Sequence, residues 1–361
     1  MYQLQKGAHL IDDQEERIQV AQLAALAAER ASGSSCFALA ADYLDLGTRM
    51  LPTRNWRDEY HLSLKLFNAS VEAHYALGKF DRARSLLDEI QEHARNEDDK
   101  ILSSTLSIYL RGSSHDLDRA IDEALVLLSS LGEVLPRWFQ MLRWIHEFTR
   151  VKRVLKNLSD SDLLALPALR NDRQEAVARL LVMTYTYLLL TQPILSLLAS
   201  LRLVRHGLEH GLSGMSAAGF AALGLVMCTV LGDVDAGIRY ATLSLRILEK
   251  YGSIEWLPRV YTSIYGFSML WKISAQETML PMMRSHRIAM GTGDIETSLL
   301  SAGIYASSAL LSSQPLRSVE ADMASFVNLC NIHKQEAMKQ VLLPNYQFAL
   351  SMLGKSDNPL A

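Results

Sequence analysis

Four segment ends recur at a constant interval in the second half of the chain, and they limit the folds open to it. Leu190, Val230, Leu270 and Leu310 each close an apolar segment, and neighbouring members lie 40 residues apart. A short turn and a second helical segment follow each of them. One helix pair cannot bury its apolar face alone, whereas stacked pairs share a continuous core. The interval predicts an all-α fold: an α-solenoid of stacked antiparallel helix pairs, tetratricopeptide-like.

The turns between these segments carry helix-start residues. Pro193 and Pro315 suit the first turn of a helix, where the missing N–H costs no hydrogen bond. Asp233 and Ser313 are the types of residue that cap helix N-termini. A 40-residue pair is close to the armadillo and HEAT lengths, and it is also consistent with elongated tetratricopeptide units.

The first half shows a shorter interval. Gly78 and Gly112 lie 34 residues apart, which is the tetratricopeptide period. Each is predicted to sit in a turn between two helices, and Asp81 is predicted to cap the second helix of its pair. Glycine and proline breakers divide the whole chain into helices of about 16 to 20 residues; they are Gly33, Pro52, Gly78, Gly112, Gly132, Pro136, Pro167, Pro193, Gly232, Gly252, Pro315 and Pro344.

These patterns predict four segments. N-terminal helical repeats cover 1–135, and a basic aromatic helix with a linker covers 136–172. C-terminal repeats of about 40 residues cover 173–354, and 355–361 form a tail. A loop is expected from Ser159 to Asp172, at the joint between the two arrays.

Composition excludes several classes of protein. Hydrophobic residues make up 49% of the chain, enough for a large core, and a net charge of −3 argues against a nucleic-acid partner. Cys36, Cys228 and Cys330 lie far apart and form no pair motif, so we expect buried thiols in a reducing compartment. The first residues contain no apolar core of a signal peptide. We therefore expect a cytoplasmic protein.

Two stretches test the membrane interpretation. Leu180 to Leu201 and Gly211 to Gly232 each run 22 residues without a charged side chain, which is long enough to cross a bilayer. The first contains threonines, Gln192 and Pro193, and the second is rich in Gly, Ala and Ser. This content favours buried helices of a helical array, so no membrane span is expected.

Catalytic motifs are absent from the sequence. There is no P-loop, no kinase catalytic loop, no Gly-x-Ser-x-Gly elbow and no His-Glu-x-x-His. Met290 to Asp294 is glycine-rich, but its position indicates the cap at a helix end. We expect no catalytic residues, no cofactor and no enzymatic activity.

One histidine pair has the spacing of metal ligands. His206 and His210 stand four residues apart on a predicted helix, but no third ligand lies near them in sequence. Arg202 and Arg205 are close by, so a basic helix end that favours the helix dipole is the simpler interpretation. No metal is expected.

The basic aromatic segment is the most suggestive candidate surface. Residues 136–156 carry six Lys or Arg against a single acid, Glu147, with Trp and Phe interleaved. The rings at helical spacing are typical of a core with arginines at its edge. Alternatively the segment is a surface for an acidic partner, a membrane face or phosphates. Under this second interpretation Arg143, Arg150 and Arg153 are the partner-binding residues.

At this point the residues support a comparison with a family. The chain resembles the tetratricopeptide-like region that follows the AAA ATPase domain in large multidomain sensor kinases, which combine serine/threonine kinase and histidine kinase modules. The similarity covers roughly residues 14 to 333, and its landmarks are 16–23, 38–47, Trp56, 60–66, 73–78, 131–136, 163–167, 222–228 and 231–237. None of these is a catalytic residue, and the kinase, ATPase and GAF modules are missing from the chain.

The resemblance implies a signalling context, while the repeats by themselves imply a scaffold. We expect a non-catalytic helical-repeat scaffold that mediates protein–protein or interdomain contacts, with kinase or AAA ATPase modules as candidate partners. The alternative is a fragment of a multidomain AAA ATPase/sensor kinase that couples nucleotide state to kinase output. An in-frame P-loop upstream of Met1 would favour the alternative.

Overall fold

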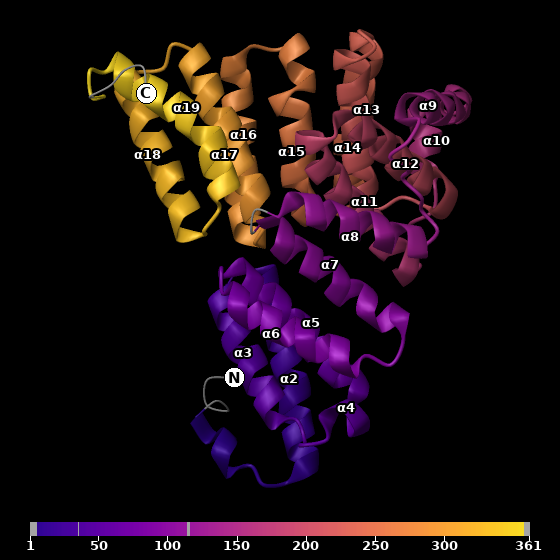
Figure 1. Cartoon of the computed structure of the whole chain (residues 1–361), viewed down its shortest axis with the longest axis vertical. Coiled ribbons are helices and arrows are strands. Elements are labelled where there is room, and N and C mark those ends of the chain that lie inside the picture. Colours follow the sequence, from indigo (N-terminus) through magenta and orange to yellow (C-terminus); the bar gives the residue numbers. More distant parts are fainter. Residues whose placement is uncertain (1–5, 35, 114–115, 357–361) are drawn as a thin grey trace. The chain divides into compact units, whose positions relative to one another are not determined.

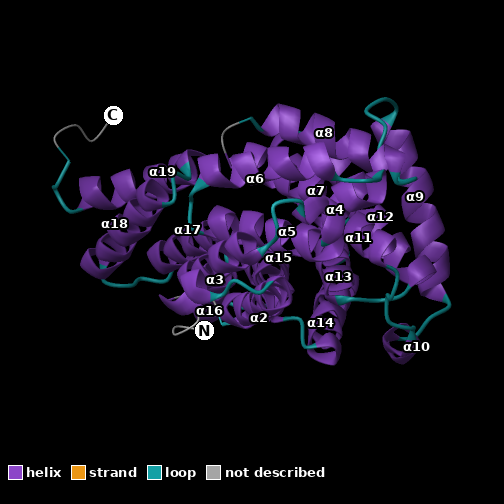
Figure 2. Cartoon of the chain, turned by 90° about the horizontal axis from the view of Figure 1, so that it is seen from below, coloured by secondary structure: helices purple, strands orange, loops and turns teal. Residues whose placement is uncertain are grey.

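The chain folds into helices throughout. The computed structural model describes residues 6–34, 36–113 and 116–356, and Figure 1 shows the course of the chain. Helices make up 82% of the protein and no strand occurs in the described ranges, so the all-α prediction is confirmed. Figure 2 shows the helices joined mainly by short loops. Consecutive pairs pack in a sequential, solenoid-like arrangement, as the repeat interval predicted.

The helices group into two compact units. Unit 1 comprises Met1–Arg111 together with Met290–Ile295, and unit 2 comprises Gly112–Ala289 together with Glu296–Ala361. The predicted boundaries at 135, 172 and 354 concern changes in repeat type, and they stay predictions. Residues 357–361 of the predicted tail lie outside the described residues.

Unit 1 is built on a small-residue core. Its elements are η1 (Ala8–Leu10), α2 (Gln14–Gly33), α3 (Phe37–Met50), α4 (Asn55–Asp58), α5 (Tyr60–Ala76), α6 (Phe80–His93) and the part of α7 (Glu97–Ser113) up to Arg111. Buried alanines of α2 pack against leucines of α3 and α5. The Trp56 ring centre lies 4.9 Å from that of Phe67 and 5.1 Å from that of His93, so this landmark is a partly buried residue that packs against the core.

Unit 2 contains the long-period array. After α8 (Leu117–Ser130), α9 (Gln140–Lys156) and α10 (Asp160–Ala165) come the pairs α11 (Asp172–Thr191) with α12 (Pro193–His210) and α13 (Gly214–Thr229) with α14 (Val234–Tyr251). The next first helix is α15 (Leu257–Gly266), flanked by the 3-10 turns η2 (Ile254–Trp256) and η3 (Ser268–Trp271). Then follow α16 (Ala275–Thr292), the pair α17 (Ile295–Leu311) with α18 (Leu316–Ile332), and α19 (Glu336–Met352).

The first helices of the pairs form one row. α11 contacts α13, and α13 contacts α15. The Thr262 and Ser301 hydroxyls, 2.9 Å apart, join α15 to α17, and the Asn345 amide donates to Ser307 at 2.7 Å between α19 and α17. This row is the continuous stack that the 40-residue interval predicted.

Three of the four interval residues occupy matching places at the ends of these helices. Leu190 lies in the last turn of α11, and its side chain is outside the described part of the structure. Val230 caps α13, and Leu310 lies in the last turn of α17. Leu270 corrects the prediction in one detail: α15 has already ended at Gly266, and Leu270 belongs to η3.

The predicted helix starts are partly confirmed. Pro193 opens α12, and the Asp233 side chain accepts from the Ala236 N–H at the start of α14. Ser313 is not a cap: it lies in a left-handed turn with φ 55°, and Pro315 precedes α18. Asp81 lies inside the first turn of α6, which Lys79 precedes, so it meets the helix dipole rather than the cap position.

Two predicted interruptions are wrong, and a third is displaced. Gly112 is the penultimate residue of α7, so the break between α7 and α8 comes just after it; an added Cβ would clash with the Tyr187 hydroxyl, so close packing also explains this glycine. Pro344 lies inside α19, which continues through it. The expected loop after Ser159 contains α10, which begins with a capping box between Ser159 and Asp162.

Other expectations concern burial and helix ends. Cys228 and Cys330 are buried, as predicted. The prediction is wrong for Cys36, which is exposed at the N-cap position of α3, outside the packed face of the helix. Gly293, with φ 77°, follows the end of α16, which confirms the cap turn.

The uncharged stretches are buried helices of the array. Fourteen of the sixteen residues of α13 are buried, as are most residues of the α11–α12 hairpin. Among the described residues, no helix has both the length and the apolar composition needed to cross a bilayer.

The α13–α14 pair is held by contact between two backbones. An added Cβ on Gly224 would lie 2.8 Å from the Gly237 carbonyl oxygen, and one on Gly237 would lie 2.8 Å from the Gly224 carbonyl oxygen. Both glycines belong to landmarks of the family resemblance. Close helix packing therefore explains them without a functional role.

We predict that Gly224→Ala destabilises the protein by about 1 to 3 kcal/mol, because the methyl group would push α13 and α14 apart. Gly33→Ala is the matched control, since Gly33 ends α2 and an added Cβ meets nothing within 4 Å. Urea unfolding of both variants measures the effect. Equal midpoints for the two variants would contradict the close contact.

Candidate functional site

Helix α9 is the centre of the basic aromatic segment. Phe139 precedes it in a left-handed conformation, with φ 53°, which large side chains rarely adopt. One face of α9 is buried through Trp144, Val151 and Leu155, which recur at helical spacing. These side chains lie toward α12, the helix that α9 contacts.

A buried group of charges joins α9 to α12. Glu147 of α9 is 3% exposed and lies on the same face as Trp144. Its carboxylate stands 3.2 Å from Arg205 Nε and 3.6 Å from Arg202 Nε. Glu133, in the loop before α9, stands 3.1 Å from Arg205 Nη2 and 3.5 Å from Arg202 Nη1. We call Glu133, Glu147, Arg202 and Arg205 the charge cluster.

The geometry of the charge cluster is only partly directional. Arg205 Nη2 donates hydrogen bonds to both oxygens of Glu133, each at 3.1 Å. The approach of the two Nε atoms to Glu147 is close but poorly aligned, so these contacts are mainly electrostatic. Burial lowers the pKa of the Arg202 guanidinium, and the Glu147 carboxylate opposes that shift. Removal of one partner would leave a buried charge uncompensated.

The three predicted partner-binding arginines have different surroundings. Arg143 is half-buried, and its guanidinium carbon lies 4.4 Å from the centre of the Trp138 ring. Arg150 donates to a Glu209 carboxylate oxygen at 2.8 Å. Arg153 is exposed and forms no ion pair with any residue that the structure describes. Of the three, Arg153 is the one whose charge faces solvent without an acidic partner.

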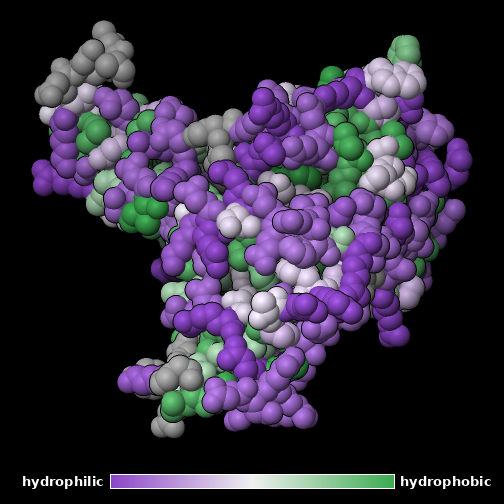
Figure 3. Space-filling view, turned by 60° about the horizontal axis from the view of Figure 1, so that its bottom comes forward, coloured by the Kyte–Doolittle hydropathy of each residue, from purple (hydrophilic) through white to green (hydrophobic). Residues whose placement is uncertain are grey.

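The interpretation of the aromatic residues as core is right for the inner face of α9 and wrong for the two rings that precede the helix. Trp144 is buried, and Phe148 stacks on it with ring centres 5.2 Å apart. Trp138, Phe139 and Ile145 are 61%, 66% and 48% exposed. In Figure 3 hydrophobic side chains (green) gather at the upper right, over α8 and the loop that leads to α9.

The outer face of α9 carries both apolar and cationic side chains. Met141, Leu142 and Ile145 are 50%, 65% and 48% exposed. Lys152, Arg153 and Lys156 are exposed in the last two turns. We call these six residues the outer α9 surface. Sequence reasoning counted Lys152 and Lys156 among the cations of the segment but chose only arginines as partner-binding residues, and it missed Met141 and Leu142. Helical spacing places Leu142 and Lys156 on the side away from Trp144 and Val151, while Met141 and Lys152 flank the buried face.

The histidine pair is not arranged as a metal site. His206 is 1% exposed, and its Nε2 lies 3.0 Å from the Gln174 side-chain oxygen. Burial, the neighbouring His210 and Arg205 lower the pKa of His206 to about 4. In the described part of the chain, no three His, Cys, Asp or Glu side chains form a group that could hold a metal ion.

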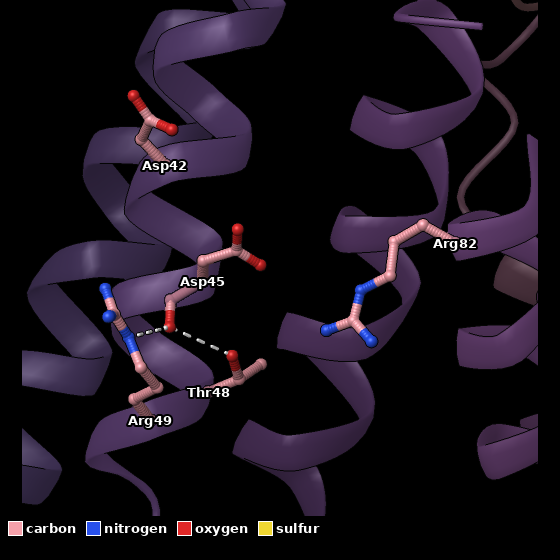
Figure 4. A pocket seen from close by; sticks show the side chains of 5 residues that line it. All are labelled: Asp42, Asp45, Thr48, Arg49 and Arg82. Atoms are coloured by element: carbon pink, nitrogen blue, oxygen red, sulfur yellow. Dashed lines mark hydrogen bonds between the residues drawn. The ribbon is translucent and has the colours of Figure 1, made fainter. Parts of the chain in front are cut away.

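Unit 1 carries a separate polar hollow of about 320 Å³ between α3 and α6. Figure 4 shows Asp42, Asp45, Thr48 and Arg49 on α3, with Arg82 of α6 on the opposite wall. The Arg49 Nε and the Thr48 hydroxyl both donate to the Asp45 backbone oxygen, at 3.0 and 3.2 Å. Two carboxylates and two guanidiniums largely balance in charge, so the hollow favours neither an anion nor a cation.

The fold and these sites do not identify a family by comparison. No protein-family model matches the chain, and no curated protein matches it. The chain is an all-helical protein whose helices pack in adjacent pairs. Its function therefore has to be argued from the surfaces just described.

We predict that Glu147→Ala costs about 3 kcal/mol of unfolding free energy, because it leaves the largely buried Arg202 and Arg205 with Glu133 and a more distant, exposed acid, Glu209, which lies 3.9 Å from Arg205. Glu336→Ala is the control: Glu336 is exposed and pairs with Lys339 at 3.7 Å, a contact that contributes less than about 1 kcal/mol. Urea unfolding compares the two. Similar losses in both variants would show that the charge cluster does not stabilise the fold.

The low pKa of His206 makes stability depend on pH. Neutral His206 is favoured in the fold, so its contribution is complete above its ordinary pKa of 6.5 and declines as the pH falls toward 4. We predict that up to about 3 kcal/mol is lost across this window. His206→Gln should lose less stability between pH 7 and pH 4 than the unmodified protein. His61→Gln, at an exposed position of α5, is the control that should keep the full pH dependence.

Proposed function

We propose that this chain is a non-catalytic, cytoplasmic helical-repeat scaffold that mediates protein–protein or interdomain contacts in signalling. The observation that carries the proposal is the outer α9 surface. Three large apolar side chains and three cations stand exposed on a helix that the charge cluster fixes to α12. A rigid, exposed surface of mixed apolar and charged character is typical of a protein interface.

The rest of the chain supports a scaffold by its architecture. Stacked helix pairs bury their faces against each other and leave an extended surface, which repeat proteins use for binding. The polar side chains described above already have partners within the fold: the buried His206 lies against the Gln174 side-chain oxygen, and the acidic and basic groups of the polar hollow in unit 1 largely balance in charge.

A second candidate function rests on the family resemblance. The chain would then be a region of a multidomain AAA ATPase/sensor kinase, and it would relay the nucleotide state of the ATPase to the kinase. The landmarks at 222–228 and 231–237 contain Gly224 and Gly237, where α13 and α14 come into backbone contact. The tetratricopeptide-like region of a sensor kinase would need glycines at the same places if its helices packed equally closely. Sequencing upstream of Met1 separates the candidates, because an in-frame P-loop favours the second.

We predict that charge reversal of the outer α9 surface weakens partner binding by at least about tenfold. The variant is Lys152→Glu with Arg153→Glu and Lys156→Glu, since Arg143 and Arg150 also hold Trp138 and Glu209 in place. Purified kinase and AAA ATPase modules are the baits, and biolayer interferometry measures the dissociation constant.

The matched control reverses three exposed cations elsewhere in unit 2: Arg246, Lys272 and Arg317. It changes the net charge of the protein by the same amount and should bind like the unmodified chain. Equal weakening in both triple variants would indicate a general charge effect. No binding by the unmodified chain to any of the modules would reject these partners.

A further inference from the structure

The outer α9 surface changes in chemical character along the helix axis. At 100° per residue, Leu142, Ile145, Thr149, Arg153 and Lys156 fall on the side away from Trp144 and Val151, so they share one stripe with the polar Thr149 at its middle. The apolar members occupy the first two turns and the cationic members occupy the last two. The stripe is therefore an apolar half followed by a basic half, rather than an apolar face bordered by charges.

We propose that this stripe binds an acidic amphipathic helix of a partner protein, which lies antiparallel to α9. This inference rests on the proposed scaffold function and names the chemistry of the partner. Apolar anchors of the partner would cover Met141, Leu142 and Ile145, and its carboxylates would meet Lys152, Arg153 and Lys156. Complementary charge sets the register of such a pair and speeds its formation.

The orientation follows from the helix dipoles. Carboxylates are favoured in the first turns of a helix, so the acidic half of the partner is expected at its N-terminal end. The basic half of the stripe lies at the C-terminal end of α9. An acidic N-terminal half meets that basic end only when the two helices run antiparallel, an arrangement in which the macrodipoles also attract each other.

The start of α9 adds further apolar area for the partner. Trp138 and Phe139 are exposed, and their rings lie in edge contact with centres 5.5 Å apart. The Arg143 guanidinium lies 4.4 Å from the centre of the Trp138 ring and helps to hold it outside the core. The backbone at Phe139 has the left-handed conformation already described, and such strain is common at ligand-binding sites.

A partner helix fits this stripe better than a bilayer does. A helix that lies in a membrane surface needs apolar side chains along its whole length, with cations on both flanks. In α9 the cations Arg153 and Lys156 stand in line with Leu142, where acyl chains would have to lie. An apolar half followed by a basic half along one helix is complementary to a partner helix that has an apolar half and an acidic half.

The test uses the full chain and designed helical peptides. The first peptide has Asp and Glu in its N-terminal half and Leu and Ile at helical spacing in its C-terminal half. The second has the two halves exchanged, and the third replaces the acids with Gln. Fluorescence anisotropy gives the dissociation constants, and cosedimentation with vesicles of phosphatidylcholine and phosphatidylserine tests the bilayer.

We expect the first peptide to bind at least about tenfold more tightly than the other two. Leu142→Glu with Ile145→Glu should abolish its binding, and circular dichroism should show an intact fold because both side chains are exposed. The Arg246, Lys272 and Arg317 control should bind normally.

Three results would overturn the inference. Equal binding of the first two peptides would reject the antiparallel order, and no binding of any peptide would reject an acidic helix as the partner. Cosedimentation that depends on Lys152 and Lys156, without peptide binding, would assign the surface to a bilayer. Failure of the kinase and ATPase baits with retention of the first peptide would reject only those partners.

Discussion

The apolar face of each helix pair can leave water only against the neighbouring pair, and the arrangement of unit 2 depends on this constraint. Helix α13 shows it most clearly, because α11, α12, α14 and α15 all contact it and it carries no charged residue. Glycines at the α13–α14 contact let two backbones meet, so the largely buried α13 also packs closely against its partner. Each further helix pair then packs against the pair before it in the stack.

Helix α9 stands outside this repeating order and is held in another way. Its buried face is narrow, and Glu147 interrupts the apolar stripe between Trp144 and Val151. The Glu147 carboxylate lies against Arg202 and Arg205 of α12. If α9 rotated or slid along α12, these ion pairs would be lost and the charges would stay buried without a partner, which is costly. The charge cluster therefore fixes which face of α9 points outward, and the candidate interface follows from that orientation.

Much of the fold follows from the sequence, while the site follows only in part. Pro193, Asp233 and the 40-residue interval predicted the helix pairs because turns and caps depend on local chemistry. The Ser159–Asp162 pattern could have predicted α10, since it forms a capping box. The exposure of Trp138 and Phe139 could not be predicted, because burial depends on where α9 lies in the stack. Pro344 shows the same limit: packing against α17 and α18 keeps α19 helical through a local breaker.

Hydrogen exchange of the full chain, followed by mass spectrometry, tests the stacked arrangement most directly. If the pairs stabilise one another, amides of α13 exchange most slowly within unit 2, protection declines through α17 to α19, and α9 exchanges together with α12. An α9 that exchanges as fast as a free helix, or equal protection from α11 to α19, would contradict the account.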